Sequence, residues 1–385
     1  MAELIALDVH GGEQFLESLT RIWDRGDAVM PLDLAGPRSH VESMLEAMRP
    51  AGLIDANGEL QKLDGGVPVE DGDATVITTS GTTGVPKGAV HTHEAVRAAG
   101  RITTAASRPG DSDTWLACLP LSHVGGFSVT TRALTTGAGL IIHDGFDAAA
   151  VDSAASAGAT HVSLVPTVLP RIDAGPWTTI LLGGSQIPST RPHNSIATYG
   201  MTETFGGVIY DGFPLSDVEL RVDADSMIEI RSPTLLRAYR SNSDPEGTDP
   251  LSPEGWYKTG DLGEIDPSTG LLSVSGRADD LIITGGEKVW PGPVEEVILL
   301  DPRVRECLVT SRPDPEWGQR VVAMVIPSDP RTPPKLKDLR WLVRERLPVA
   351  AAPKELLIVD ALARTSLGKL RRGDTLGLGD RPPGE

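Results

Sequence analysis

The chain has 385 residues, more than a single hydrophobic core usually serves, so at least two domains are expected. Its net charge of −18 argues against non-specific binding to nucleic acid. Its two cysteines, Cys118 and Cys307, are too far apart in sequence for a metal or redox motif and are expected to be buried thiols. No apolar run reaches membrane-spanning length and no basic stretch precedes an apolar one at the N-terminus, so we expect a cytoplasmic protein without membrane insertion.

Residues 79–88 read Thr-Ser-Gly-Thr-Thr-Gly-Val-Pro-Lys-Gly, which gathers hydroxyls, glycines and one lysine in a single loop. Glycine lets successive N–H groups turn inward together, and such a nest binds anions, phosphate above all. The β-branched run at 74–78 predicts a strand and the alanine-rich stretch at 92–106 predicts a helix, so the loop is expected to lead from strand into helix. The lysine stands between proline and glycine, which is not the order of a Walker A loop. Composition alone would also allow an ordinary surface loop.

After the loop, predicted strands and helices alternate as far as residue 208. This alternation indicates βαβ units, with helices on both faces of a sheet. From Val208 the segments alternate polar and apolar residues and indicate antiparallel strands, while residues 241–255 indicate an exposed loop because they are rich in Ser, Asp, Pro and Gly. Before residue 208, strands are expected at 114–119, 140–143, 161–165 and 180–182, and helices at 126–134 and 148–157.

The C-terminal part of the chain differs in charge from the rest. Residues 331–385 carry 12 Lys and Arg against 7 Asp and Glu, so the first 330 residues carry a net charge of −23. We therefore predict an α/β protein with a large domain over residues 1–276, made of doubly wound βαβ sheets and a small β subdomain, followed by an α+β domain over residues 277–385. Signals over residues 1–70 are weak. In the second domain, strands are expected at 281–283, 306–310 and 321–326, and helices at 294–300 and 335–346.

Further motifs carry groups suited to nucleotide chemistry, although each alone has a plain structural explanation. The run Tyr-Gly-Met-Thr-Glu at 199–203 combines a ring, a hydroxyl and a carboxylate, but alone it is typical of a strand end. Asp261 and Arg277 could each hydrogen-bond a sugar diol, or could form only a surface ion pair. Lys369 follows a glycine in the basic C-terminal region and His123 follows an apolar strand; alone, they would be a solvated lysine and a packing histidine.

Taken together, these motifs resemble the adenylate-forming enzymes, the family of acyl-CoA synthetases, luciferases and peptide-synthetase adenylation domains. The loop at 79–88 resembles the family's signature loop, and the resemblance spans roughly residues 73–372. It implies an acid–thiol ligase that uses ATP, Mg²⁺ and CoA: a carboxylate displaces pyrophosphate to form an acyl-adenylate, and the thiol of CoA then takes the acyl group. The implied partners are small molecules, with no nucleic acid among them; assembly into a homo-oligomer is left open.

The resemblance also implies a role for each motif residue. Tyr199 would lie along adenine, Thr202 would bond the α-phosphate, and Glu203 would hold Mg²⁺, an ion that needs few carboxylates when phosphate oxygens and water complete its shell. Asp261 and Arg277 would bind the ribose. The residues implied to bind the nucleotide are Thr79, Ser80, Gly81, Thr82, Thr83, Gly84, Lys87, Gly183, Gly184, Tyr199, Gly200, Thr202, Asp261, Arg277 and Lys369.

Lys369 is the principal catalytic residue that the resemblance implies, together with Thr202 and His123. A carboxylate that attacks a polyanion is repelled by it, so a cation placed beside both reacting groups stabilises the transition state more than the ground state. Asp279 matches the family's hinge, about which the C-terminal domain would rotate to remove Lys369 and admit the thiol. The C-terminal domain is therefore expected to be mobile.

The acid is predicted from the run at 119–134, which contains a Pro-Leu-x-His-x-x-Gly pattern similar to the family's acyl-pocket motif. The run is most similar to members that act on o-succinylbenzoate, an aromatic dicarboxylic acid of menaquinone biosynthesis. For such an acid His123 and Arg132 are expected polar partners, with Ser185 and Thr204 as further contacts. The alternatives are a medium-chain or aryl acid, which would need a more apolar pocket, and a nucleotide-binding pseudoenzyme.

Overall fold

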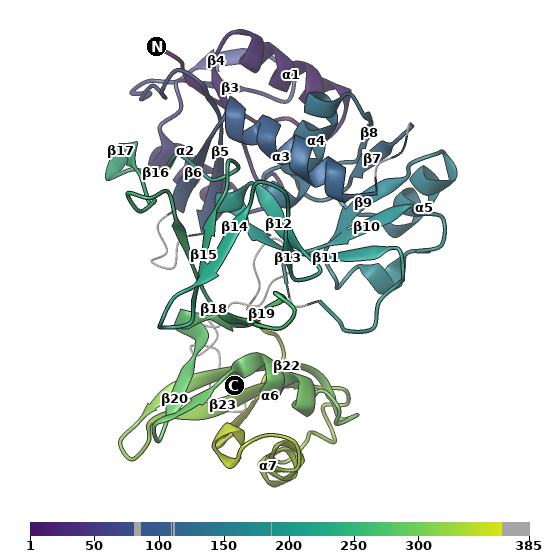
Figure 1. Cartoon of the computed structure of the whole chain (residues 1–385), viewed down its shortest axis with the longest axis vertical. Helices are drawn as coiled ribbons and strands as arrows, with labels where there is room; N and C mark the ends of the chain where they lie inside the picture. The colour runs from purple at the N-terminus through teal and green to yellow at the C-terminus, as the bar shows by residue number, and fades with distance from the viewer. Residues whose placement is uncertain (81–85, 109, 111, 186, 364–385) are drawn as a thin grey trace. The chain divides into compact units, whose positions relative to one another are not determined.

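The computed structural model describes residues 1–80, 86–108, 110, 112–185 and 187–363. The chain divides into two compact units, and Figure 1 labels most of their helices and strands. The predicted domain boundary after residue 276 and the hinge at Asp279 stay predictions. The first unit comprises Met1–Arg221, Glu229–Tyr257 and Pro267–Leu271, and the second comprises Val222–Ile228, Lys258–Asp266 and Leu272–Glu385.

The first unit holds an eight-stranded sheet with two short, apolar strands at its centre. Every residue of Leu4–Leu7 and Ala28–Pro31 is buried, as expected of strands that are covered on both faces. Strands of four residues leave too little pattern for prediction, which explains the weak signals at 1–70. In spatial order the strands are β17 (Asp244–Thr248), β16 (Ala238–Ser241), β6 (Pro86–Thr92), β5 (Asp73–Ser80), β2 (Ala28–Pro31), β1 (Leu4–Leu7), β3 (Gly52–Ile54) and β4 (Leu60–Lys62), accompanied by helices α1 (Glu13–Asp24) and α2 (Arg38–Met48).

The predicted phosphate loop joins two strands of this sheet, and the expectation that it leads into a helix was wrong. β5 and β6 pair antiparallel, with Thr79 opposite Lys87. Helix α3 (His93–Ala106) begins only after β6, where the Thr92 hydroxyl accepts a hydrogen bond from the N–H of Ala95 at 3.1 Å. β6 escaped notice because its residues 88–91 are buried in succession, so they show no alternation of polar and apolar side chains.

The predicted βαβ alternation is confirmed in a second, seven-stranded sheet of the first unit. Strands β7, β8, β9, β10 and β11 are parallel, whereas β12 and β13 add antiparallel. In spatial order the strands are β13 (Phe213–Pro214), β12 (Gly206–Tyr210), β11 (Ser195–Met201), β10 (Thr179–Leu182), β9 (His161–Leu164), β7 (Thr114–Ala117) and β8 (Gly139–Ile142), with helices α4 (Val124–Thr136) and α5 (Ala148–Ser156) and the 3₁₀ turns η1 (Leu169–Arg171) and η2 (Thr202–Thr204).

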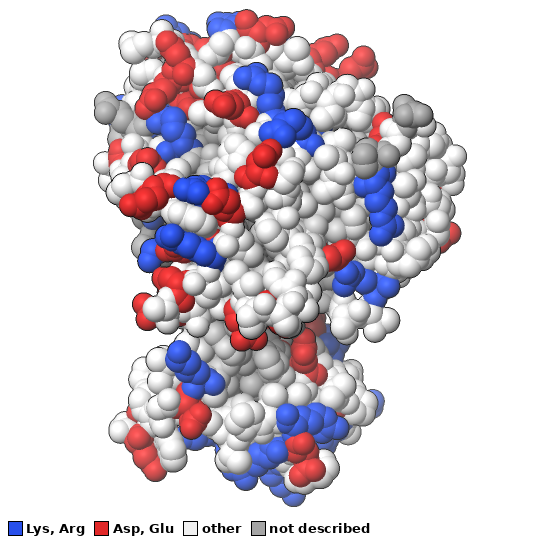
Figure 2. All heavy atoms as spheres, viewed as in Figure 1, with Lys and Arg blue, Asp and Glu red and all other residues white. Residues whose placement is uncertain are grey.

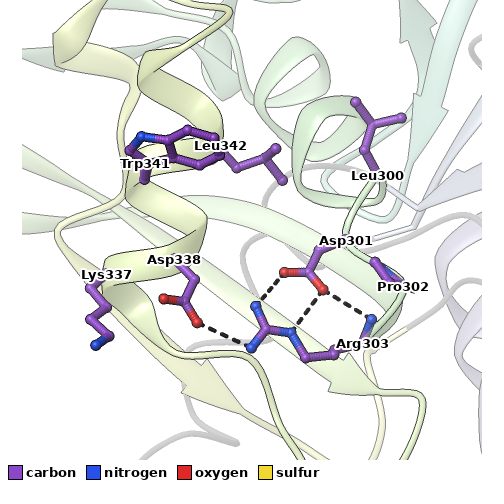
Figure 3. A pocket seen from close by; sticks show the side chains of 8 residues that line it. All are labelled: Leu300, Asp301, Pro302, Arg303, Lys337, Asp338, Trp341 and Leu342. Carbon is purple, nitrogen blue, oxygen red and sulfur yellow. Dashed lines mark hydrogen bonds and ion pairs between the residues drawn. The ribbon is translucent and has the colours of Figure 1, made fainter.

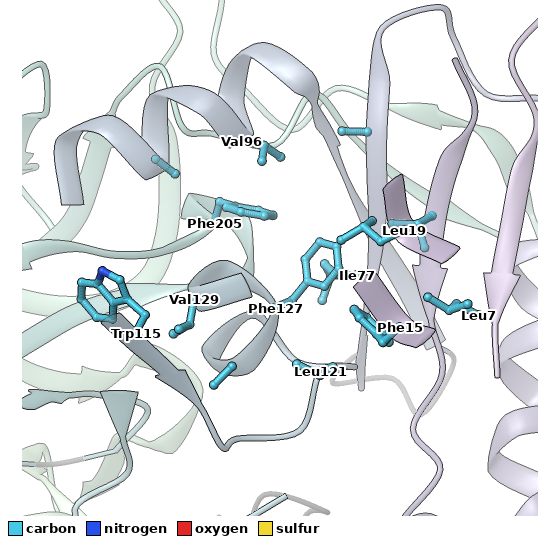
Figure 4. Close-up of a cluster of buried hydrophobic side chains, with 14 of the residues drawn as sticks. Leu7, Phe15, Leu19, Ile77, Val96, Trp115, Leu121, Phe127, Val129 and Phe205 are labelled. Carbon is cyan, nitrogen blue, oxygen red and sulfur yellow. The ribbon is translucent and has the colours of Figure 1, made fainter. Parts of the chain in front are cut away.

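One hydrophobic core connects both sheets of the first unit through α1, α3 and α4 (Figure 4). At its centre, Phe127 of α4 makes edge-to-face contacts with Phe15, at 6.5 Å between ring centroids, and with Phe205, at 6.2 Å. Burying an aromatic side chain contributes about 1.5–3 kcal/mol, and such ring pairs add about 1 kcal/mol. The core therefore fixes α4, which carries Arg132 and follows His123, between the two sheets.

The remaining strands form two smaller sheets. Antiparallel pairing is confirmed for β18 and β19, and the α+β pattern predicted for the C-terminal part is confirmed in the second unit, which has its own buried core. The four-stranded sheet has the order β14 (Glu219–Val222), β15 (Met227–Arg231), β18 (Tyr257–Ile265) and β19 (Leu272–Arg277). The five-stranded sheet has the order β21 (Glu287–Val289), β20 (Ile282–Thr284), β23 (Gly318–Pro327) and β22 (Val304–Asp314), with β24 (Glu355–Ile358) on β23, helices α6 (Pro291–Ile298) and α7 (Leu336–Arg344), and turns η3 (Ala278–Asp280) and η4 (Val349–Ala351).

Two simpler expectations have clear outcomes. Cys118 and Cys307 are both free and buried, as predicted, and burial raises the pKa of Cys118 to about 12. The predicted loop at 241–255 is partly wrong because it contains β17, which pairs with β16. Over the part of the chain that the structure describes, no helix has both the length and the apolar character needed to cross a membrane.

Candidate active site

The predicted motifs of the first unit follow the carboxyl ends of parallel strands. His123 comes after β7, Gly183 and Gly184 follow β10 directly, and Thr202 and Glu203 follow β11. The carboxyl ends of parallel strands meet at one edge of a sheet, where open α/β sheets bind their ligands. The fold therefore brings segments that are far apart in sequence to the same edge.

A close backbone approach explains the glycine in the motif at 199–203. A Cβ at Gly200 would lie 2.0 Å from the carbonyl oxygen of Gly206 on the neighbouring strand β12. The pairing of β11 with β12 shifts register between Tyr199 and Gly200. Only glycine allows the two strands this close just before the turn that carries Thr202 and Glu203.

The Thr202–Glu203 segment is anchored through its main chain to other parts of the first unit. Nε2 of His91, on β6, lies 2.9 Å from the carbonyl oxygen of Thr202, and the N–H of Leu236 donates to the carbonyl of Glu203 at 2.8 Å. Burial lowers the pKa of His91 to about 4, so the imidazole is neutral at pH 7. Since a carbonyl can only accept, Nε2 carries the hydrogen.

The carboxylate of Glu203 accepts a hydrogen bond from Tyr239, which in turn contacts Tyr257; the motifs gave neither tyrosine a role. The hydroxyl of Tyr239, on β16, donates to Glu203 Oε1 at 2.6 Å, and the hydroxyls of Tyr239 and Tyr257 lie 2.9 Å apart. Burial, followed by the nearby Glu203 carboxylate, raises the pKa of Tyr239 far above its ordinary value, so the hydroxyl keeps its hydrogen. Nζ of Lys87 lies 5.7 Å from the centroid of the Tyr239 ring.

The structure tests whether Glu203 could serve as the predicted metal ligand. Among the described residues there is no group of three or more His, Cys, Asp and Glu side chains that could hold a metal ion. A lone, half-buried carboxylate suits Mg²⁺ that arrives with a nucleotide, because this ion retains phosphate oxygens and water as ligands. The arrangement at Glu203 thus fits a metal–nucleotide complex and not a dedicated protein cage.

His123 and Arg132, the two residues expected to contact the acid, lie at opposite ends of α4. His123 is the N-cap residue, and burial lowers its pKa while the nearby Asp33 carboxylate opposes that shift. Arg132 lies nine residues further on, about 13 Å along the helix axis. The two side chains therefore start from well-separated points on the helix.

Arg132 is a buried cation without an acidic partner among the described residues. Only 5% of its surface is exposed, its Nε donates to Thr103 Oγ1 at 2.9 Å, and its guanidinium lies 4.3 Å from the centroid of the Trp115 ring. Nη1 has no hydrogen-bond partner within the described part of the chain. A buried charge without a counter-charge is costly, and Nη1 could still donate to an anion.

The other two predicted substrate contacts differ in exposure. Ser185 is exposed just beyond the carboxyl end of β10, and its role stays a prediction. Thr204 is fully buried; its hydroxyl donates to the carbonyl of Gly206 at 2.6 Å and accepts from the N–H of Met201 at 2.9 Å. The Thr204 hydroxyl thus stabilises the η2 turn, and its contact with substrate stays a prediction.

In the second unit, the residues predicted to bind ribose are neighbours. Asp261 and Arg277 face each other across β18 and β19, with Nη1 of Arg277 3.6 Å from Asp261 Oδ1 and donating to the carbonyl of Thr259 at 2.9 Å. This brings the two side chains together as expected, and their contact with ribose stays a prediction. Asp279 is exposed in η3.

Part of the predicted site lies outside the described residues. On the N-terminal side of the phosphate loop, β5 ends at Ser80. The Thr79 hydroxyl donates to the carbonyl of Lys87 at 3.3 Å. The predicted nucleotide-binding roles of this loop and the catalytic role of the lysine stay predictions. The residues outside the described part are Gly81, Thr82, Thr83, Gly84 and Lys369.

A surface pocket on the second unit does not coincide with any of these residues (Figure 3). Leu300 and Trp341 line it from two sides. Its arginine, Arg303, already pairs with Asp301 at 2.7 Å and with Asp338 at 3.1 Å. Arg303 is thus already paired with two carboxylates, and the pocket's other cation is Lys337.

Tyr239, Tyr257 and His91 are the residues that sequence reasoning missed. The chain has only four tyrosines, and three of them, including Tyr199, lie in or against the segment that carries Glu203. Because tyrosine is so rare in this chain, each tyrosine could have been considered as a site residue. His91 gave none, because a buried histidine within a strand looks like any packing residue.

Comparison with known proteins identifies the class. The family described as AMP-binding enzyme matches residues 54–227, and the family described as AMP-binding enzyme C-terminal domain matches residues 293–369. A probable 2-succinylbenzoate–CoA ligase of Mycobacterium tuberculosis is 38% identical over 381 residues, which cover 93% of each chain. The chain therefore belongs to the AMP-binding enzymes, which confirms the resemblance to adenylate-forming enzymes.

Two further proteins point in the same direction. A 2-succinylbenzoate–CoA ligase of Bacillus anthracis is 32% identical over 337 residues, covering 77% of this chain and 68% of the relative. The solved structure of o-succinylbenzoate CoA synthetase (MenE) from Bacillus subtilis, in complex with the acyl-adenylate intermediate OSB-AMP, is 25% identical, with a TM-score of 0.78 over 100% of this chain and 89% of that one. The predicted α/β fold class is confirmed by this likeness.

Proposed function

We propose that this protein is an ATP-dependent acid–CoA ligase that converts 2-succinylbenzoate, ATP and CoA into o-succinylbenzoyl-CoA, AMP and pyrophosphate, a step of menaquinone biosynthesis. The similarity to the Mycobacterium tuberculosis protein over 93% of both chains supports this activity, because that relative bears the name of this ligase. The cytoplasmic location stays a prediction, and whether the protein forms a homo-oligomer stays open.

The reaction takes place in two steps. In the first, a carboxylate oxygen of the acid attacks the α-phosphorus of ATP, a P–O bond forms, and pyrophosphate leaves. Thr202 would bond the α-phosphate, Lys369 would neutralise the charge shared by the reacting groups, and Glu203 would hold Mg²⁺, which offsets the charge of the phosphates. In the second, the thiol sulfur of CoA attacks the acyl carbonyl, its proton is released, and AMP leaves.

Arg132 is the observation that carries the choice of acid. A monocarboxylic acid uses its only carboxylate in the reaction, whereas 2-succinylbenzoate has a second one that must be neutralised within the pocket. The buried guanidinium, with Nη1 unpaired among the described residues, is suited to that second carboxylate. His123, at the other end of α4, would then lie on the side of the reacting carboxylate.

The test is a panel of acids incubated with ATP and CoA, with the CoA esters detected by mass. We expect product from 2-succinylbenzoate and little from benzoate or octanoate, and Lys369→Ala should abolish it. Arg132→Met should raise KM for 2-succinylbenzoate about ten- to hundredfold, the range for a hydrogen-bonded charge, without changing KM for ATP.

Other outcomes would favour the alternatives. Product from octanoate or benzoate but not from 2-succinylbenzoate would indicate a fatty or aryl acid ligase. No product from any acid, with ATP still bound, would indicate a nucleotide-binding pseudoenzyme. If Arg132→Met lowered thermal stability but left KM for the acid unchanged, Arg132 would only tie α4 to Thr103 and Trp115.

A further inference from the structure

Glu203 is tethered at two points. Its main-chain carbonyl accepts a hydrogen bond from Leu236, and its Oε1 accepts one from Tyr239 at 2.6 Å. One hydrogen bond thus restrains the backbone of Glu203, and the other restrains its carboxylate. The second carboxylate oxygen, Oε2, makes no hydrogen bond or ion pair with any other residue in the described part of the chain.

The direction of the hydrogen bonds follows from the chemistry of the groups. An ionised carboxylate can only accept, so Tyr239 donates its single hydroxyl hydrogen to Glu203. The Tyr239 oxygen then accepts from the hydroxyl of Tyr257, 2.9 Å away. Each hydrogen bond in such a chain polarises the next, so Tyr257 strengthens the contact between Tyr239 and Glu203.

Tyr239 also connects Glu203 with the strand that follows the predicted phosphate loop. On β16 it pairs with Ala89 of β6, and the amino group of Lys87, also on β6, lies over its ring. Movement of β6 relative to the η2 turn would therefore disturb the Glu203 carboxylate.

We propose that Tyr239 is a positioning residue that holds the Glu203 carboxylate so that Oε2 faces the divalent cation bound with ATP. The inference rests on the proposed role of Glu203 as the metal ligand, and adds the residue that sets its orientation. Groups that hydrogen-bond metal ligands commonly change metal affinity by about 10- to 100-fold when they are removed.

The experiment measures Mn²⁺ binding to the full chain saturated with ATP, by electron paramagnetic resonance of free Mn²⁺, without acid or CoA. We expect Tyr239→Phe to weaken Mn²⁺ binding about tenfold and to leave ATP binding in EDTA unchanged. Tyr257→Phe, which removes a matched hydroxyl one step further from Glu203, should weaken Mn²⁺ binding only about twofold. For each variant, ATP binding is compared with and without metal. A general loss of folded protein lowers both values equally and so cancels in the comparison.

Glu203→Gln separates the inference from the proposal on which it rests. If Glu203→Gln loses Mn²⁺ affinity while Tyr239→Phe keeps it, Tyr239 has no positioning role and Glu203 remains the metal ligand. If neither variant changes the affinity, the role of Glu203 fails and the inference fails with it. If Tyr239→Phe weakens ATP binding equally with and without metal, Tyr239 shapes the nucleotide site in general, which also contradicts the inference.

Discussion

Individual polar residues hold the first unit together by reaching main-chain carbonyls far away in sequence. His91 contacts the carbonyl of Thr202. Arg240, only 2% exposed, donates from Nε to the carbonyl of Met48 at 2.8 Å and from Nη2 to that of Val67 at 2.7 Å. Such hydrogen bonds satisfy buried polar groups that would otherwise be costly.

His91 predicts how stability depends on pH. Its pKa is about 4 in the folded chain, against an ordinary 6.5, so below pH 6.5 the unfolded chain takes up the proton first and stability falls until pH 4 is reached. Between pH 7 and pH 5 this one group should remove about 2 kcal/mol of unfolding free energy. Urea unfolding at both pH values measures this loss of unfolding free energy. Glutamine keeps a hydrogen-bond donor but does not titrate, so His91→Gln should not show the loss of about 2 kcal/mol that is due to His91. Equal pH dependence in both proteins would contradict the assignment.

At the scale of elements, α4 shows why the predicted acyl motif needs glycine at 126 but not at the neighbouring position 125. A Cβ at Gly126 would lie 2.3 Å from the carbonyl oxygen of Leu119 and 2.5 Å from that of Pro120, whereas a Cβ at Gly125 would meet only Leu119 Cδ1, at 3.3 Å. The first turn of the helix packs directly on the segment that follows β7. Gly126 thus serves this close approach, and Gly125 does not.

The two glycines form a matched pair for mutation. Gly126→Ala should destabilise the protein by about 2 kcal/mol, because backbone must move to relieve the clash. Gly125→Ala should be neutral or stabilising by up to about 1 kcal/mol, because alanine favours a helix and the neighbouring leucine tip can give way. Urea unfolding of the two variants measures the difference. Equal effects would show that the packing at Gly126 is not as close as described.

At the scale of the whole molecule, the two units have separate hydrophobic cores. The core of the second unit is formed by α6, α7 and the five-stranded sheet. In Figure 2, Lys and Arg side chains gather at the bottom of the view, where Figure 1 places α7. Each core is built from its own set of buried side chains, which predicts that each unit unfolds in its own transition.

Two fully buried leucines test that separation. Leu19→Ala in α1 should lower the unfolding free energy of the first unit only, by about 2–5 kcal/mol. Leu339→Ala in α7 should lower that of the second unit only, by a similar amount. Differential scanning calorimetry of the full chain resolves the transitions. One shared transition that both variants lower would contradict independent cores.

The sequence by itself determined the family, the alternation of strands and helices, and the chemistry of the motifs, because these depend on residues close together in the chain. Tyr199, Thr202 and Glu203 could be read in this way. Only the tertiary structure decided that the phosphate loop closes a β-hairpin, that Thr204 faces inward, and that Tyr239 meets Glu203. The reason is physical: strand pairing and side-chain contacts join residues far apart in sequence, and local patterns carry no record of which segments meet.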